Sequence, residues 1–115
     1  MARMFNEAEL LERVDNDIGF LSETAEMLTS DGPPLLEQLG AAVAAGDAAA
    51  VGRLAHTLKG MVSNFCAPSV QTCAMELEKM GKGGDLAAAG PALEAVKQGV
   101  SELTTELLDF IKARV

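Results

Sequence analysis

The chain has 115 residues, about the length of one domain on the usual range of roughly 100–200 residues. Its residues are 49% hydrophobic and 23% charged, a balance that is typical of a globular protein and excludes intrinsic disorder. No window of about 18 apolar residues is free of charge, so the sequence predicts no membrane span. The net charge is −8 and the only aromatic residues are four Phe. This excludes nucleic-acid binding, because the acidic surface would repel phosphate backbones and has no Trp or Tyr for base stacking.

Helix-forming segments rich in Ala, Leu, Glu and Met follow one another along the chain, separated by a few Gly, Pro and Asp turns. The pattern predicts helices near 6–14, 16–29 (continuing or restarting over 34–45), 48–64, 69–80 and 86–113. Short turns between long amphipathic helices favour antiparallel neighbours. We therefore predict an all-α fold, an antiparallel four-helix bundle with an additional short N-terminal helix, in a single domain of residues 1–115.

Three of the predicted helix starts carry capping signals. Asp47 is expected to be an N-cap, and Pro68-Ser69 is expected to open the next helix. Asp85 is expected to cap the last helix, although Gly90-Pro91 would kink that helix or delay its start. These signals support the order and spacing of the predicted helices.

The only histidine, His56, lies in the middle of the predicted helix over 48–64. On a helical wheel at about 100° per residue, the face opposite His56 is apolar and is expected to be the core face. Its residues are Val51, Leu54, Leu58, Met61, Val62 and Phe65. The residues within about 60° of His56 are Gly52, Arg53, Lys59, Gly60 and Ser63. His56 is therefore predicted to be exposed at the centre of a polar face.

Two glycines, Gly52 and Gly60, lie one turn to either side of His56. Each costs about 1 kcal/mol relative to Ala in a helix interior, so their presence calls for a reason. We expect both to keep side chains away from the imidazole and to let another surface approach it. The neighbouring cations favour an anion at the ring, and Lys59 can reach a group attached to Nε2. The alternative is a solvated surface histidine with incidental neighbours, which leaves the two glycines unexplained.

The charge is unevenly distributed along the chain. Residues 1–50 contain ten acidic and two basic residues, whereas residues 51–115 contain seven of each. Residues 51–82 contain four cations and two acids, a local charge of +2. An anion is therefore expected to bind this stretch rather than the acidic remainder.

The hexapeptide Ala55-His56-Thr57-Leu58-Lys59-Gly60 contains the spacing H-x-x-K-G. This spacing resembles the core of histidine-containing phosphotransfer (HPt) domains, and the resemblance covers nearly the whole chain, most strongly from about 38 to 82. Other positions that fit the family pattern are Gly46-Asp47, Ala67, Glu76-Leu77-Glu78 and Gly81. The family fold is a four-helix bundle with an extra N-terminal helix, which agrees with the fold predicted above.

The resemblance implies a role for each site residue. His56 would be the phosphorylated residue, which attacks an aspartyl phosphate through Nε2 and later gives the phosphoryl group to another aspartate. Lys59 would offset the phosphoryl charge, and Gly60 would keep the approach open. Glu78 falls where the family has a Gln or Glu that can hydrogen-bond Nδ1. Such a carboxylate would fix the ring tautomer and raise the basicity of Nε2.

The expected docking surface for a partner consists of Gly52, Arg53, Ser63 and Lys82. For Lys82, the sequence favours a purely solvated side chain over a contribution of positive charge at the rim of the site. One departure from the family pattern concerns the end of the histidine helix, where Phe65-Cys66-Ala67 lacks a glycine C-cap. Asn64 or a 3₁₀ turn is expected to end that helix instead.

The resemblance implies a phosphoryl carrier rather than an enzyme, since the sequence has no P-loop, no Gly-rich nucleotide-binding segment and no acidic metal cluster. No cofactor or metal is expected, and Cys66 and Cys73 are interpreted as buried thiols in a reducing cytoplasm. The expected partner is a receiver domain of a response regulator or hybrid histidine kinase, which would supply the Mg²⁺ and acid chemistry. We expect a free-standing cytoplasmic monomer that binds neither nucleic acid nor membrane.

Two other functions compete with the carrier. The first is a non-phosphorylated helical docking module for a signalling partner, in which His56 is silent. The second is an enzyme that uses His56 as a general base, although no nucleophile or oxyanion-stabilising group accompanies it. Treatment with a phosphorylated receiver separates the carrier, which gains an acid-labile, base-stable phosphate, from the docking module, which gains none.

Overall fold

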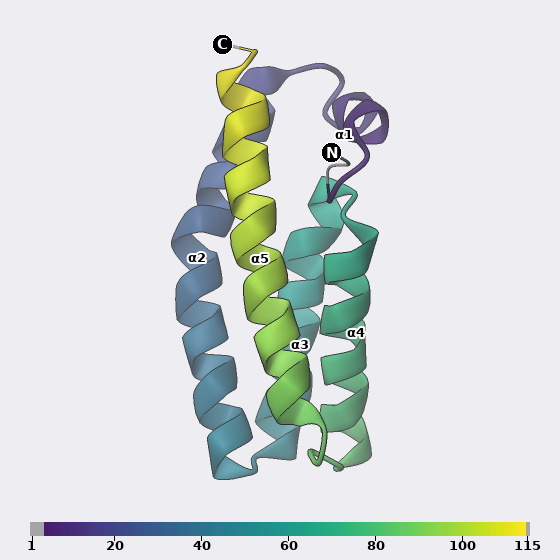
Figure 1. Cartoon of the computed structure of the whole chain (residues 1–115), viewed down its shortest axis with the longest axis vertical. Coiled ribbons are helices and arrows are strands. Elements are labelled where there is room, and N and C mark those ends of the chain that lie inside the picture. The colour runs from purple at the N-terminus through teal and green to yellow at the C-terminus, as the bar shows by residue number, and fades with distance from the viewer. Residues whose placement is uncertain (1–3, 115) are drawn as a thin grey trace.

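A computed structural model describes residues 4–114; residues 1–3 and 115, which belong to the expected domain range, lie outside the described residues. Within residues 4–114 the chain forms five α-helices and one 3₁₀ turn (Figure 1). Their bounds are α1 Glu7–Arg13, α2 Ile18–Ala45, α3 Ala48–Val62, η1 Ser63–Phe65, α4 Pro68–Gly83 and α5 Ala89–Lys112. No strand occurs in this range, which confirms the predicted all-α fold.

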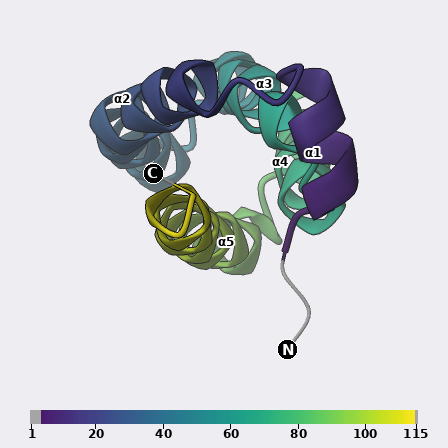
Figure 2. The ribbon, with the colours of Figure 1, turned by 90° about the horizontal axis from the view of Figure 1, so that it is seen from above.

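The four long helices stand side by side as an antiparallel bundle around one core (Figures 1 and 2). α3 packs between α2 and α4, and α5 closes the ring by packing against α4 and α2. α1 lies across one end of the bundle, above α3 and α4 (Figure 2). Its start is tied to the end of α3, because the backbone N–H of Asn6 donates to the carbonyl oxygen of Cys66 at 3.1 Å. The predicted bundle with its short N-terminal helix is therefore confirmed.

The longest helix, α2, runs through Pro33 and Pro34 without interruption, so the segments expected over 16–29 and 34–45 form one helix. Each proline removes one N–H from the backbone hydrogen bonds of the helix. The buried side chains of Leu28 and Leu35, one on either side of the prolines, anchor both halves in the same core. Among the helices of the described part of the chain, none is long and apolar enough to span a membrane.

The predicted caps of α3 and α4 are confirmed, whereas that of α5 is wrong. Asp47 accepts a hydrogen bond from the N–H of Ala50 at 3.1 Å, and Pro68 occupies the first turn of α4. Asp85 instead accepts from the N–H of Ala87 in the turn before α5, which begins only at Ala89. The reason is Pro91, which fits a helix only in its first turn, where its missing N–H is not needed.

The end of α3 is built without a glycine. The helix tightens into the 3₁₀ turn Ser63–Phe65, and Cys66 then adopts the left-handed conformation with φ of 54°. The hydroxyl of Ser63 donates to the carbonyl oxygen of Gly60 at 2.8 Å and so satisfies one group of the last turn. The expected 3₁₀ ending is thus confirmed.

Candidate functional site

His56 lies on the outer face of α3, where 64% of its side chain is exposed. The apolar face of the same helix points into the bundle, as the helical wheel predicts. Its buried members are Val51, Leu54, Leu58 and Val62, the buried Phe65 of η1 continues the same face, and Met61 is partly buried against them. The exposure of the ring is therefore a direct result of the amphipathic pattern of α3, since burying the opposite face leaves His56 in solvent.

Glu78 of α4 reaches across to the ring. Its carboxylate oxygen Oε2 lies 2.7 Å from Nδ1 of His56, and only 6% of its side chain is exposed. A carboxylate so deeply buried needs charged or hydrogen-bonded partners, because burial disfavours its ionised form. The structure thus brings together the two residues that the sequence resemblance paired.

Two lysines supply those partners. The ammonium nitrogen of Lys59 lies 2.8 Å from Oε1 of Glu78, and that of Lys82 lies 2.9 Å from Oε2. Hydrogen bonds from Lys59, then from Lys82 and then from His56 lower the pKa of Glu78 to about 2, against the opposing effect of burial. Glu78 is therefore ionised at neutral pH and acts only as an acceptor.

The ionised carboxylate determines which ring nitrogen carries the proton. Because Glu78 can only accept, the Nδ1 of His56 donates to it, and the neutral ring then leaves Nε2 without a proton. The bare Nε2 belongs to the exposed ring and has a lone pair available for attack on an electrophile. This arrangement can form a bond from Nε2 to a group that approaches from solvent.

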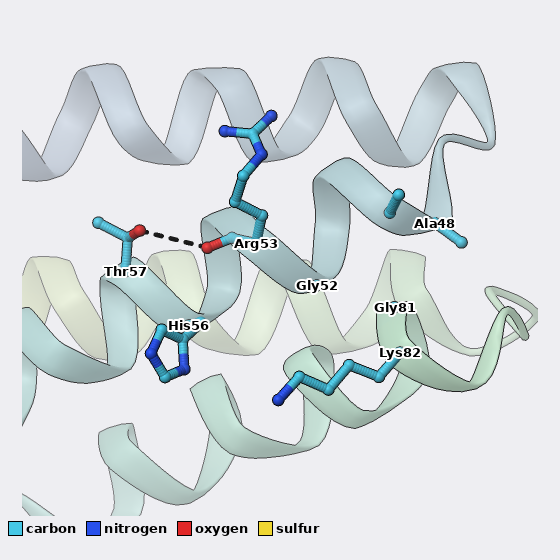
Figure 3. A pocket seen from close by; sticks show the side chains of 8 residues that line it. Ala48, Gly52, Arg53, His56, Thr57, Gly81 and Lys82 are labelled. Carbon is cyan, nitrogen blue, oxygen red and sulfur yellow. Dashed lines mark hydrogen bonds between the residues drawn. The ribbon is translucent and has the colours of Figure 1, made fainter.

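A hollow of about 590 Å³ opens beside the ring, between α3 and α4 (Figure 3). Its floor consists of small residues and its edges carry polar and charged ones: Ala48, Ala49, Gly52, Arg53, His56, Thr57, Gly81 and Lys82. Figure 3 shows Lys82 extending from α4 toward His56, whereas Arg53 points away from the ring toward α2. Of the expected docking residues, Gly52, Arg53 and Lys82 line this hollow.

Ser63 is placed differently. It lies at the end of α3, about two turns beyond His56, and its hydroxyl is engaged with the backbone of Gly60. The structure therefore gives Ser63 a local role in ending the helix and does not bring it into the cluster around Glu78.

The two glycines that flank His56 differ. A Cβ built at Gly60 has no atom within 4 Å, so the space beside the ring is open there, as expected. Gly52 is buried, and a Cβ at this position would lie 3.3 Å from the backbone nitrogen of Lys82. The expectation that Gly52 leaves open space beside the ring is wrong, because α4 fills that space.

Two features of the site were missed or undervalued from the sequence. Lys82 is bound to Glu78, whereas the sequence favoured a solvated side chain; the spacing of four residues between them was the available signal. Gly81 faces Gly52 directly, and a glycine on each of two neighbouring helices was the only hint of this contact. Both contacts depend on the packing of α3 against α4, which the residue pattern of one helix does not predict.

Neither a metal centre nor a disulfide accompanies the site in the described part of the chain. No group of three or more His, Cys, Asp or Glu side chains in residues 4–114 could hold a metal ion. Cys66 and Cys73 are free thiols, and both are half-buried rather than fully buried as expected. Burial and the nearby Glu9 raise the pKa of the Cys66 thiol, with Arg13 opposing them.

Comparison with known proteins connects this geometry to a family. The family model of the Hpt domain matches residues 23–106. Among solved structures, the histidine-containing phosphotransfer protein B (HptB) from Pseudomonas aeruginosa PAO1 matches with a TM-score of 0.88 and 23% identity, covering 98% of each chain, and it shows the same fold. The comparison with curated proteins found no match. The chain therefore belongs to the Hpt domain family and is a histidine phosphotransfer protein of phosphorelay signalling.

Proposed function

We propose that His56 is the residue that carries the phosphoryl group, on Nε2, between aspartates of receiver domains or from a histidine kinase. The observation that carries this proposal is the contact of 2.7 Å between Nδ1 of this exposed ring and the buried carboxylate of Glu78. A donor approaching from solvent meets the nitrogen that has the free lone pair. A silent surface histidine would not need a buried, ionised carboxylate behind it.

The proposed transfer balances as follows. The lone pair of Nε2 attacks the phosphorus of an aspartyl phosphate, the new N–P bond forms, and the bond from phosphorus to the acyl oxygen breaks. The aspartate leaves as a carboxylate with the electron pair of that bond. The ring gains positive charge as Nε2 bonds, and the Glu78 carboxylate at Nδ1 stabilises this charge. The reverse sequence passes the phosphoryl group to the next aspartate.

The other residues support binding and charge. Lys59 lies one turn from His56 and, bound to Glu78, keeps a positive charge close to the incoming phosphoryl oxygens. Gly60 leaves the space beside the ring free for the partner. Arg53 and Lys82 at the edge of the hollow are proposed to contact the receiver, and Gly52 contributes backbone to the same hollow. Ser63, at the end of α3, is proposed to contact the receiver outside the hollow.

We propose further that the protein works as a carrier whose partner supplies Mg²⁺ and acid catalysis. We also propose that it is a cytoplasmic monomer and that residues 1–115 form one domain. A receiver domain is the partner proposed, in line with the family. Since the carrier itself holds only the nucleophile and its charged support, its rate depends on which receiver docks at the hollow beside His56.

The test is transfer from a receiver domain that has first been phosphorylated with acetyl phosphate. We expect the protein to gain one phosphate that is acid-labile and base-stable, which mass spectrometry places on His56. The matched control is His56→Gln, which we expect to gain no label while its unfolding free energy changes by about 0.5 kcal/mol or less, because the ring is exposed. A parent protein that binds receivers but never gains a label would instead be the docking module.

A further inference from the structure

α3 and α4 make direct backbone contact at two glycines, Gly52 and Gly81, which lie side by side in Figure 3. A Cβ built at Gly81 would overlap the backbone nitrogen of Gly52, and it would lie 2.5 Å from the Gly52 Cα and 2.8 Å from the carbonyl oxygen of Ala48. All three are backbone atoms, which cannot rotate away as a side chain can. Any side chain at Gly81 therefore requires the two helices to move apart.

This contact lies one turn from the His56–Glu78 pair. Gly52 precedes His56 by four residues on α3, and Gly81 follows Glu78 by three residues on α4. Because the helices are antiparallel, the two glycines and the two site residues form neighbouring levels of the same helix pair. The distance between the helix axes at the glycines is thereby coupled to the distance across which Glu78 must reach.

We infer that the Gly52–Gly81 contact positions Glu78 against Nδ1 of His56, and that Gly81 is a positioning residue for phosphotransfer. This inference rests on the function proposed above for the His56–Glu78 pair. Carbon atoms in contact are separated by about 3.5–4.0 Å, so a methyl group at Gly81 separates the backbones by about 1 Å. That shift takes the contact of 2.7 Å to the limit of hydrogen bonding or beyond it.

The chemical consequence concerns the tautomer. Once the carboxylate no longer holds the proton on Nδ1, the neutral ring distributes its proton over both nitrogens. Molecules with the proton on Nε2 have no lone pair at the exposed position and do not accept a phosphoryl group. Gly81 thus acts on the reaction without touching the ring.

The test measures the tautomer of the His56 ring by NMR of its nitrogen atoms, in the unphosphorylated protein labelled with ¹⁵N-histidine. The sequence has one histidine, so the spectrum contains a single pair of ring nitrogen signals. In Gly81→Ala we expect the preference for the Nδ1–H tautomer to fall about tenfold, the loss expected for one hydrogen bond to a charged group. The matched control is Gly99→Ala, which inserts a methyl group 3.3 Å from Val70 between α5 and α4 and should leave the ring signals unchanged.

A second variant keeps the test decisive if Gly81→Ala does not fold. In Gly52→Ala the new methyl group would lie 3.3 Å from the backbone nitrogen of Lys82, a milder overlap. We expect this variant to fold and to lose about two- to threefold in tautomer preference. Parental ring signals in a folded Gly81→Ala, or in Gly52→Ala, would overturn the inference. Failure of the parent to accept phosphate would refute the proposed function, which the ring signals do not measure.

Discussion

Gly52 and Gly60 stand at equal distances from His56 along α3, four residues before it and four residues after it, yet the molecule uses them in opposite ways. Gly60 faces solvent, and a side chain there would meet nothing within 4 Å. Gly52 is buried against α4, whose backbone occupies the space that a side chain would need. One glycine leaves room for a partner, and the other leaves room for a neighbouring helix.

The difference shows that a glycine in a helix has to be judged by what lies outside the helix. Both positions lie about 40° from His56 on the helical wheel, on opposite sides. α4 covers only one of these sides, and it does so because Gly81 allows its backbone to come close. At Gly52 the cost of about 1 kcal/mol for a helical glycine is offset by packing against α4. At Gly60 nothing in the fold offsets this cost, and on our proposal the glycine is kept for the access it gives to a partner.

The largest expected effect comes from adding a long side chain on the packed side. We expect Gly52→Gln to lower the free energy of unfolding by about 3 kcal/mol, because the side chain has to enter the contact with Lys82 and Gly81. Urea unfolding followed by circular dichroism measures this loss. A Gly52→Gln protein as stable as the parent would show that α4 is free to move away from α3.

The same substitution on the open side should act on function alone. We expect Gly60→Gln to keep parental stability and to transfer phosphate about tenfold more slowly, equivalent to about 1.4 kcal/mol in the barrier. Its matched control, Gly60→Ala, should gain up to about 1 kcal/mol in stability, since Ala is the better helix former. Unfolding curves and transfer rates from one phosphorylated receiver check both. Normal transfer by a folded Gly60→Gln would contradict the open-approach explanation.

A smaller effect on stability is expected at low pH, from the carboxylate of Glu78 on α4. The pKa of Glu78 is held at about 2 in the folded protein against an ordinary value of 4.5. Its ionised form therefore stabilises the fold fully above about pH 4.5, and this contribution is lost as the pH falls toward 2. We expect the stability difference between the parent and Glu78→Gln to shrink as the pH falls from about 4.5 toward 2. Thermal unfolding at a series of pH values measures it, and a difference that does not change with pH would refute the assignment.

The smallest effects are expected from the two lysines that bind Glu78. Lys82 is 69% exposed and Lys59 is 29% exposed, so Lys82→Ala should cost about 0.5 kcal/mol or less and Lys59→Ala slightly more. Lys59→Ala should also slow transfer, with partial rescue by Lys59→Arg, because the planar guanidinium fills the site differently. Parallel unfolding and transfer assays compare the pair. Equal transfer rates for Lys59→Ala and the parent would remove the electrostatic role of Lys59.

Much of this geometry follows from the sequence because it is local to one helix. The exposure of His56, the apolar face around Leu58 and the cap at Asp47 depend on spacing within α3, and all three are found as predicted. The start of α5 lies later than the signal at Asp85 indicates because Pro91 has to lie in the first turn, and Asp85 caps the preceding turn instead, through the N–H of Ala87. Local signals fail where two local structures compete for the same side chain.

The contacts between helices could not be predicted from residue spacing in this way. The pairing of Glu78 with His56 came from the resemblance to a family, and no residue spacing alone would have produced it. The wrong expectation for Gly52 has the same origin, since the wheel of α3 does not say where α4 crosses. The crossing is set by Gly81, on a helix that begins twelve residues after His56.

The cluster at Glu78 has a consequence for the charge of the carrier during its cycle. With a neutral ring, one carboxylate and two ammonium groups give the cluster a net charge of +1, within a chain of net charge −8. The phosphoryl group carries about two negative charges, and the ring, which keeps its proton on Nδ1, gains one positive charge. The loaded cluster is therefore close to neutral, and the empty cluster differs from it by about one charge. Such a small change suits a carrier that both receives and gives away its cargo, since neither form stores a large excess of charge.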